Sequence, residues 1–209
     1  FHGHRRRMAD AMSVAVRTAG VAHVVFLSAA AASLSADNGP ARDLHHAENA
    51  LRASGARVTA IRACYFQDNV LAVACPARQE GVYPSFLPSP DVAFPTVATR
   101  DIGRIAARAL VEPPAASEIV DLVGPAYSVR DMAGILGQAI GRDLRIVTIP
   151  PAEQVAVLIQ QASLPRAFAE ALAEMFACFA SGRVSPQGDR TERGTTTLEE
   201  VLRDGLESQ

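Results

Sequence analysis

Two short apolar stretches, HVVFLS at residues 23–28 and RVTAIRA at residues 57–63, decide the fold. Both are rich in β-branched residues, which is typical of strands that are buried on both faces of a sheet. Helices are expected over residues 4–19 and 41–54, because apolar side chains recur there at helical spacing. The order helix, strand, helix, strand predicts an α/β fold: a parallel sheet with right-handed crossovers, helices on both faces, and these two strands in its interior.

The pattern changes after residue 79. Residues 80–99 are rich in proline, which fits neither a helix interior nor a central strand, so an extended excursion with short edge strands is expected there. Beyond it the alternation resumes, and Ser128 and Asp131 have the spacing of a capping box. We expect helices over residues 100–111 (capped by Thr99), 128–141, 151–162, 166–180 and from 198 onward, strands over 118–124 and 144–150, and a loop between 181 and 195.

Composition excludes several classes of protein. The 209 residues are 49% hydrophobic and 20% charged, with a formal net charge of −2, which excludes a disordered chain. A nucleic-acid binder needs a broad basic face, whereas the longest basic run is Arg5 to Arg7, which we interpret as the solvated start of a helix. No apolar stretch approaches the ~20 residues that cross a bilayer, so no membrane span is expected.

The cysteines and the first residues suggest a compartment. Cys64, Cys75 and Cys178 are odd in number and irregularly spaced, which predicts neither a disulfide framework nor a metal site. We interpret them as reduced thiols of a cytoplasmic protein, and we expect no signal peptide because no apolar run directly follows the basic cluster. The sequence begins with Phe1 rather than methionine, so residues upstream are expected to be missing.

Several stretches resemble one protein family. HVVFLSA, followed by NGPARDLHHAENALRASGARVTAIRACYFQDNVL, resembles the middle of an NmrA-like protein, in the atypical short-chain dehydrogenase/reductase superfamily. The stretches VATRDIGRIAARALVEP, EIVDLVGPAYSVRDMAGILGQAIGR and GTTTLEEVL also resemble that family, so the resemblance spans essentially the whole chain. It implies a partial Rossmann-like parallel sheet with a small C-terminal α/β substrate lobe. Residues 1–79 would then be the C-terminal part of a dinucleotide-binding domain, and residues 80–209 a substrate lobe interleaved with the last sheet elements.

The sequence departs from that family in one large respect. The family's glycine-rich loop, which holds the pyrophosphate at a helix N-terminus, has no counterpart here. Gly134, Gly137 and Gly141 lie within and at the end of an amphipathic helix instead. By the family's layout about three strands are absent, which would expose an apolar sheet edge. Three explanations stay open: a fragment of a longer protein, upstream residues lost in annotation, or a partner or second copy that covers the edge; we favour the first two together.

Candidate catalytic groups are few. Ordinary short-chain dehydrogenases pair a tyrosine with a lysine four positions later, but all 20 basic residues of this chain are arginine, so that mechanism is excluded for it. No catalytic residue is assigned. His45 is the one candidate for a proton role, because histidine titrates near neutral pH. A polar histidine on a helix face explains His45 at least equally well, and His46 better, while Glu48 is expected to make a helix-side contact.

The resemblance implies which residues line the cofactor. Ser28, Ala29 and Ala30 would lie on the nicotinamide–ribose side, and His45 would contact that ribose. The loop after the second strand would pass beside the nicotinamide, with its Cys64 thiol chemically inert; its residues are Ala63, Cys64, Tyr65 and Phe66. NADP is favoured over NAD by family habit alone, and no metal is expected.

The proline-rich excursion would face the nicotinamide. Its aromatic side chains suit a small-molecule pocket, which we assign to Asn69, Tyr83, Phe86 and Phe94. A lobe that only packs on the sheet explains the same residues equally well. The apolar stripe of residues 166–180, with Phe168, Met175, Phe176 and Phe179, is expected to be core.

Together these features predict an NAD(P)H-dependent reductase that transfers a hydride to a small apolar electrophile, quinone-like or enone-like. The alternatives are a non-catalytic NAD(P)-sensing regulator that binds a partner, and an inactive fragment of a longer reductase. Neither nucleic acid nor membrane is expected as a partner.

Overall fold

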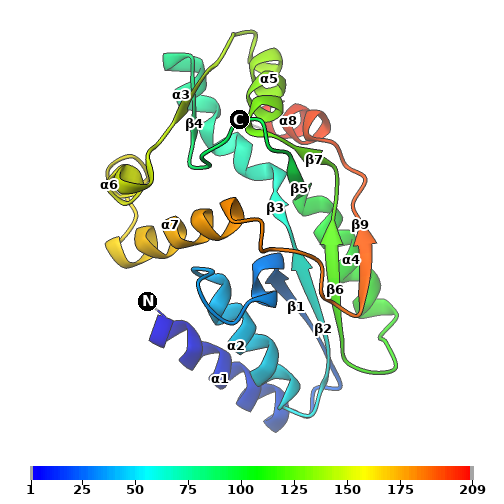
Figure 1. The fold of residues 1–209 in the computed structure, drawn as a ribbon. Coiled ribbons are helices and arrows are strands. Elements are labelled where there is room, and N and C mark those ends of the chain that lie inside the picture. Colours follow the sequence, from blue (N-terminus) through cyan, green and yellow to red (C-terminus); the bar gives the residue numbers. More distant parts are fainter. Residues whose placement is uncertain (1, 208–209) are drawn as a thin grey trace.

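The computed structural model describes residues 2–207 and contains a four-stranded parallel sheet (Figure 1). Its strands are β1 (His23–Ala29), β2 (Arg57–Ala63), β6 (Glu118–Val123) and β9 (Arg190–Arg193), in the order β1-β2-β6-β9. All three neighbouring pairs are parallel. The predicted α/β class with a parallel sheet is therefore confirmed.

Helices cover both faces of this sheet. On one face, α2 (Ala41–Arg52) packs on β1 and β2, and α1 (His2–Thr18) packs against α2. The core on that face includes Leu51 and Val58. On the other face, α4 (Thr99–Val111) covers a cluster that includes Ile61 and Leu122. We call these the α2 face and the α4 face.

The expected exposure of an apolar sheet edge is present: among the described residues β1 pairs only with β2, and its Leu27 is 46% exposed. Within these residues β1 therefore does not have the interior position that its apolar sequence indicated, and a second prediction about the sheet is wrong. Residues 190–193 were expected in a loop, but they form the outer strand β9. Its polar sequence RTER carries no strand signal; backbone pairing with β6 and contacts from Arg190 to Glu118 hold it in place.

The remaining elements form a second region beside the carboxyl ends of the sheet (Figure 1). It contains two small sheets, β4 with β8 and β3-β5-β7, and the remaining helices. The elements are η1 (Ala30–Ser33), β3 (Tyr65–Phe66), η2 (Gln67–Val73), α3 (Ala74–Glu80), β4 (Val82–Ser85), β5 (Phe94–Val97), β7 (Ala126–Tyr127), α5 (Val129–Ile140), β8 (Arg145–Thr148), α6 (Pro151–Ala162), α7 (Arg166–Ala180) and α8 (Leu198–Glu207).

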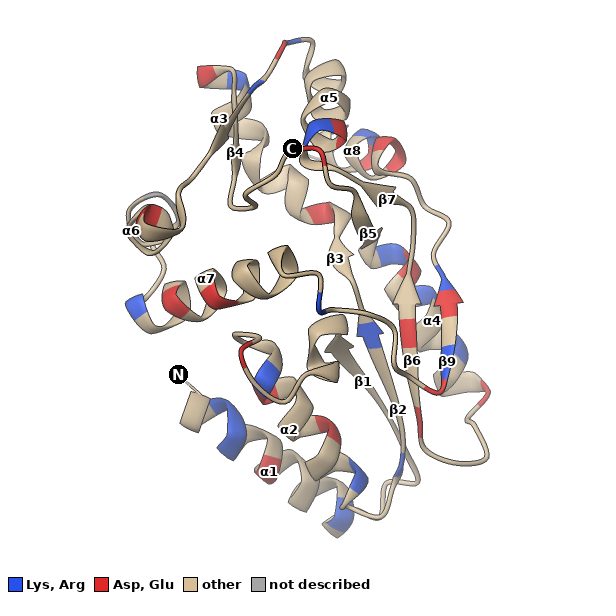
Figure 2. Cartoon of the chain, in the orientation of Figure 1, with Lys and Arg blue, Asp and Glu red and all other residues tan. Residues whose placement is uncertain are grey.

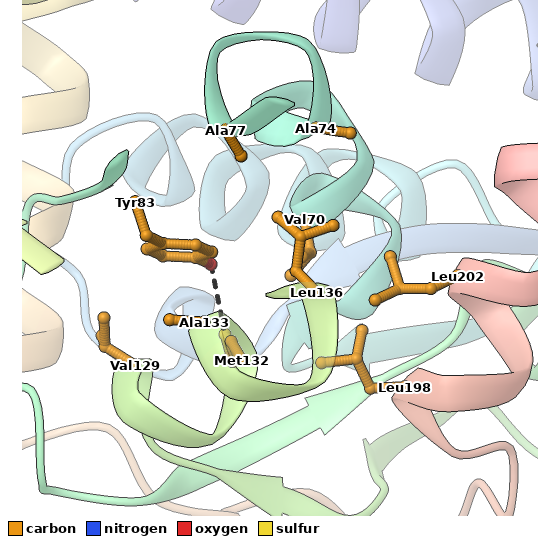
Figure 3. Close-up of a cluster of buried hydrophobic side chains, with 10 residues drawn as sticks. All are labelled: Val70, Ala74, Ala77, Tyr83, Val129, Met132, Ala133, Leu136, Leu198 and Leu202. Atoms are coloured by element: carbon orange, nitrogen blue, oxygen red, sulfur yellow. Dashed lines mark hydrogen bonds between the residues drawn. The ribbon is translucent and has the colours of Figure 1, made fainter. Parts of the chain in front are cut away.

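This second region has its own hydrophobic cluster, built from η2, α3, β4, α5 and α8 (Figure 3). Local signals place its helices well: Ser128 and Asp131 form the predicted capping box of α5, and Thr197 and Glu200 exchange the corresponding contacts at α8. Thr99 is not the cap of α4, because that position is Ala98; the Thr99 hydroxyl bonds Asp68 instead.

Charges of both signs are spread over most elements rather than gathered on one basic face (Figure 2). The arginines of the Arg5–Arg7 run lie on α1, where Arg5 and Arg6 approach the buried carboxylate of Asp43. Within residues 2–207, no helix has both the length and the apolar character needed to cross a membrane.

Candidate functional site

One polar residue from each of three neighbouring strands forms a row at the carboxyl ends of the sheet. Ser28 on β1 is in register with Arg62 on β2, and Arg62 with Asp121 on β6. Side chains alternate between the two faces of a strand, so all three project on the α2 face. Each is almost fully buried: 2% exposed for Ser28, 5% for Arg62 and 3% for Asp121. We call Ser28, Arg62 and Asp121 the polar row.

The polar row is tied to helix α2 through Glu48. The Ser28 hydroxyl donates to Glu48 Oε1 at 2.5 Å, and Arg62 donates from Nε to Oε1 at 3.0 Å and from Nη2 to Oε2 at 2.6 Å. This bidentate ion pair is buried on both sides. Such charge-assisted pairs have fixed geometry, so the ends of β1 and β2 are held rigidly against α2. Glu48 thus makes the helix-side contact that the sequence indicated.

Asp121 holds the segment that follows α7. Its Oδ2 accepts a hydrogen bond from the Gly188 backbone N–H at 2.5 Å. A Cβ at Gly188 would lie 2.7 Å from the Ile119 carbonyl oxygen, so only glycine allows this close crossing. The crossing brings residues 182–186 over the strand ends.

A pocket of about 310 Å³ opens above the polar row. Its floor is formed by the ends of the strands, including Ala30, Arg62, Cys64 and Asp121. One wall is the excursion, residues 87–89 and 92–95, and the other is residues 179–186. A volume of this size and an apolar lining with few polar groups are typical of a small-molecule site. Such sites usually lie at the carboxyl edge of a parallel sheet.

The structure brings three of the predicted site residues to this pocket: Ala30, Cys64 and Phe94. Tyr65 lies behind Phe94, with the two rings edge to face at 5.5 Å. Ser28 lies beneath the floor through its bond to Glu48. Phe179, which was expected to be core, lines the pocket instead.

Other predicted residues lie elsewhere. Tyr83 is 6% exposed and belongs to the hydrophobic cluster of Figure 3, where its hydroxyl lies 3.8 Å from Met132 Sδ. Phe86 stacks on Phe176 of α7 at 4.9 Å. Asn69 is exposed and hydrogen-bonds Tyr65, whose pKa is raised by burial.

His45, His46, Ala63 and Ala29 do not line the pocket. His45 Nδ1 lies 2.9 Å from the Ala32 carbonyl oxygen, so its ring is used to fix η1. His46 pairs with Asp10 on α1 at 2.7 Å. Ala63 belongs to the cluster on the α4 face, with Phe66 packed against it, and Ala29 ends β1.

Cys64 is the one thiol at the pocket, and its environment suppresses ionisation. Burial raises the pKa of the Cys64 thiol to about 11. At neutral pH it is therefore protonated, and a protonated thiol is a poor nucleophile and metal ligand. Within the described part of the chain, no three His, Cys, Asp or Glu side chains are grouped so that they could hold a metal ion.

Sequence reasoning did not single out Arg62 as a pocket residue, and it missed Asp121 and the segment 182–186. A signal for the first two was present, because a charged residue near the carboxyl end of an apolar parallel strand points to a site. No local signal shows that residues after α7 return to the sheet.

Comparison with known proteins identifies the family of this chain. The sequence profile of the NmrA-like family matches residues 5–202. An NAD(P)H azoreductase from Xenophilus azovorans is 28% identical over 172 residues, which are 82% of this chain and 59% of that protein. The chain thus spans a little under two thirds of the length of that curated relative.

Solved structures share the fold. An NADPH-dependent quinone oxidoreductase from Escherichia coli matches with a TM-score of 0.79 and 22% identity, covering 95% of this chain and 72% of that chain. Its complex with NADPH matches with a TM-score of 0.78 and 23% identity, covering 95% and 70%. A triphenylmethane reductase from Citrobacter matches with a TM-score of 0.73 and 22% identity, again covering 95% and 70%.

Proposed function

This chain belongs to the NmrA-like family, and we propose that it acts as an NAD(P)H-dependent reductase of a small apolar electrophile, quinone-like or enone-like, with NADPH as the preferred hydride donor. The observation that carries the proposal is the apolar pocket at the carboxyl ends of β1, β2 and β6. The relatives support it, since one is an NAD(P)H azoreductase and another an NADPH-dependent quinone oxidoreductase.

The residues present fit the nicotinamide end of a dinucleotide. Small side chains lie at the ends of β1 and β2, at Ala29 and Ala63, and at Ala30 of η1. Of these Ala30 lines the pocket, so a flat ring has room to approach the strand ends there. We assign residues 28–30 and 63–66 to that side of the site, with His45 beside them. No strand among residues 2–207 runs through a glycine-rich turn into a helix, so we assign no residue to the pyrophosphate.

The bound dinucleotide would supply the hydride. The chain's own residues orient the substrate and enclose it in an apolar setting: Phe94 and Phe179 lie on opposite walls, and the polar row closes the floor. The Ser28 hydroxyl already donates its hydrogen bond to Glu48, and burial raises the pKa of the Cys64 thiol to about 11. Water is therefore the proposed source of the proton that accompanies the hydride.

A second candidate function is a regulator that binds a dinucleotide without turnover. It is favoured by one observation, the shortage of acid–base groups: the pocket lining contains no histidine, tyrosine or lysine. Acid–base catalysis by a positioned side chain contributes about 100- to 10,000-fold to a rate, and among the described residues only Asp121 and Cys64 bring such a group to the lining.

The test follows NADPH consumption with a naphthoquinone and with an azo dye, in parallel with an NADPH-binding titration by fluorescence. We expect quinone-dependent oxidation of NADPH. Ala30→Phe should lower kcat/KM at least about tenfold, because the new ring fills a pocket scaled to one small ligand. Ala36→Phe, at an exposed loop position, is the matched control and should leave the rate unchanged.

The outcomes separate the candidates. Consumption of NADPH that Ala30→Phe reduces and Ala36→Phe does not supports the reductase. NADPH binding without consumption supports the regulator. A folded chain that neither binds nor consumes NADPH contradicts both.

A further inference from the structure

Arg62 and Asp121 keep hydrogen-bonding capacity that the protein itself does not use. Arg62 donates through Nε and Nη2 to Glu48, but its Nη1 has no hydrogen-bond partner among residues 2–207. Asp121 accepts from Gly188 through Oδ2, and within the same residues its Oδ1 accepts no hydrogen bond. Arg62 Nη1 and Asp121 Oδ1 both keep some accessible surface. Among the described residues, the fully buried side-chain atoms that lack a hydrogen-bond partner belong to other residues.

Both side chains line the pocket. Their residues are 5% and 3% exposed, so what little surface they keep meets the pocket. A polar group in a nearly dry, apolar setting is stabilised strongly by a partner and is costly without one. The floor therefore offers a donor from Arg62 next to an acceptor from Asp121.

The charges of the floor are unequal. Glu48 is neutralised by its bidentate pair with Arg62, and the carboxylate of Asp121 adds one further negative charge. No other charged side chain lines the pocket. A ligand that gives Asp121 an N–H or O–H is therefore favoured over one that presents only acceptors.

We propose that Arg62 and Asp121 select, among apolar electrophiles, those that carry a carbonyl oxygen next to an N–H or O–H donor, such as an amino-substituted quinone. The carbonyl oxygen accepts from Arg62 Nη1, and the donor gives its hydrogen to Asp121 Oδ1. This inference rests on the proposed function, because it names the substrate class of the same pocket.

The arrangement of the strands supports this pairing. Arg62 and Asp121 are register partners on adjacent parallel strands, which lie about 4.8 Å apart. Two substituents on neighbouring carbons of one ring can therefore reach one group each. A substrate without the donor leaves Oδ1 of the buried Asp121 carboxylate without a partner, and a hydrogen bond to a charged group contributes about 10- to 100-fold in affinity.

The test compares an aminonaphthoquinone that has free N–H groups with its N,N-dimethyl analogue, which lacks them. Both kcat/KM with NADPH and the dissociation constant without NADPH are measured, the latter by titration of quinone absorbance. The chain itself should prefer the N–H form by about 10- to 100-fold in both measurements. Differences in intrinsic reactivity between the two quinones cancel when the same ratio is compared between the chain and its variants.

Asp121→Asn is the decisive variant. The asparagine carbonyl oxygen can take over the bond from Gly188, which turns the atom facing the pocket from an acceptor into a donor. We expect the preference for the N–H form to vanish or reverse. Asp189→Asn is the matched control, because Asp189 also accepts a backbone N–H, that of Ile119, but lies outside the pocket. It should keep the full preference.

Two results would overturn the inference: no preference in the unaltered chain, or the same preference in Asp121→Asn. Failure of the proposed function looks different. If neither quinone supports consumption of NADPH, the reductase proposal fails. The ratio of the dissociation constants of the two quinones then still shows whether Arg62 and Asp121 favour a ligand with an N–H donor.

Discussion

The two faces of the four-stranded sheet are built from the same strands but differ in chemistry. On the α4 face, Ile61 and Leu122 are fully buried in an apolar cluster. On the α2 face, the residues next to them in the chain, Arg62 and Asp121, form the floor of the pocket. Because side chains alternate along a strand, one residue step separates a position in the apolar core from a position that lines the pocket. Truncating a core position on the α4 face should therefore lower stability without changing recognition in the pocket.

Glu48→Ala should give the largest effect. It leaves the buried Arg62 guanidinium without its counter-charge and the Ser28 hydroxyl without its acceptor. Breaking a buried ion pair by removing one partner typically lowers the free energy of unfolding by about 3–5 kcal/mol. Urea unfolding followed by circular dichroism measures this loss. Glu80→Ala, at an exposed position, is the control and should change stability by less than about 0.5 kcal/mol.

This first change tests whether the α2 face also carries part of the stability. A loss below about 1 kcal/mol for Glu48→Ala would mean that the buried pair is replaceable by water and does not hold the strand ends.

Leu122→Ala should follow. Leu122 is fully buried on the α4 face, so truncation removes apolar contacts and leaves a cavity, which lowers the free energy of unfolding by about 2–5 kcal/mol. The neighbouring Asp121→Asn should change stability much less. Under conditions where both variants remain folded, Leu122→Ala should keep the preference between the two quinones. Loss of that preference in Leu122→Ala would show that the faces are coupled.

Glu118→Gln should give the smallest effect, at the end of β6 away from the pocket. Hydrogen bonds from Arg190 lower the pKa of Glu118 below its ordinary value of 4.5, partly offset by burial. The stabilisation is therefore present above pH 4.5 and is lost as the pH falls through the lowered pKa. A partly exposed pair contributes only about 0.2–1 kcal/mol.

Thermal unfolding of both proteins near neutral pH and at about pH 3 checks this sign. The difference between Glu118→Gln and the unaltered chain should shrink at the lower pH. A difference that grows with acid would show that β9 is held by other contacts.

Sequence patterns predicted most of the regular elements because local chemistry specifies them. Strand β2 has the predicted bounds, and the capping box at Ser128 starts α5 where expected. Strand β9 could not be predicted, since a polar outer strand is formed by pairing with its neighbour and not by apolar side chains. The edge position of β1 among the described residues has a different cause, since an apolar sequence suits an edge strand and a central strand alike.

The site divides in a similar way. Ala30 and Cys64 follow strand ends, and the resemblance to the NmrA-like family implied that both lie beside the cofactor; the structure places both in the lining of the pocket. Tyr83 and Phe86 are aromatic residues of the proline-rich excursion, and nothing in their local sequence distinguishes a pocket wall from core. Packing decided that Tyr83 fills the cluster around Met132 and that Phe86 stacks on Phe176.

The sequence by itself determined the α/β class, the family and the edge of the sheet at which the pocket lies, because periodicity and strand ends are local properties. Only the tertiary structure decided which residues meet there. Register between β1, β2 and β6 aligns Ser28, Arg62 and Asp121, and Gly188 returns across 67 residues of chain to bond Asp121. Such contacts form because they lower the free energy of the whole packed chain, so they cannot be predicted from the sequence of any single segment.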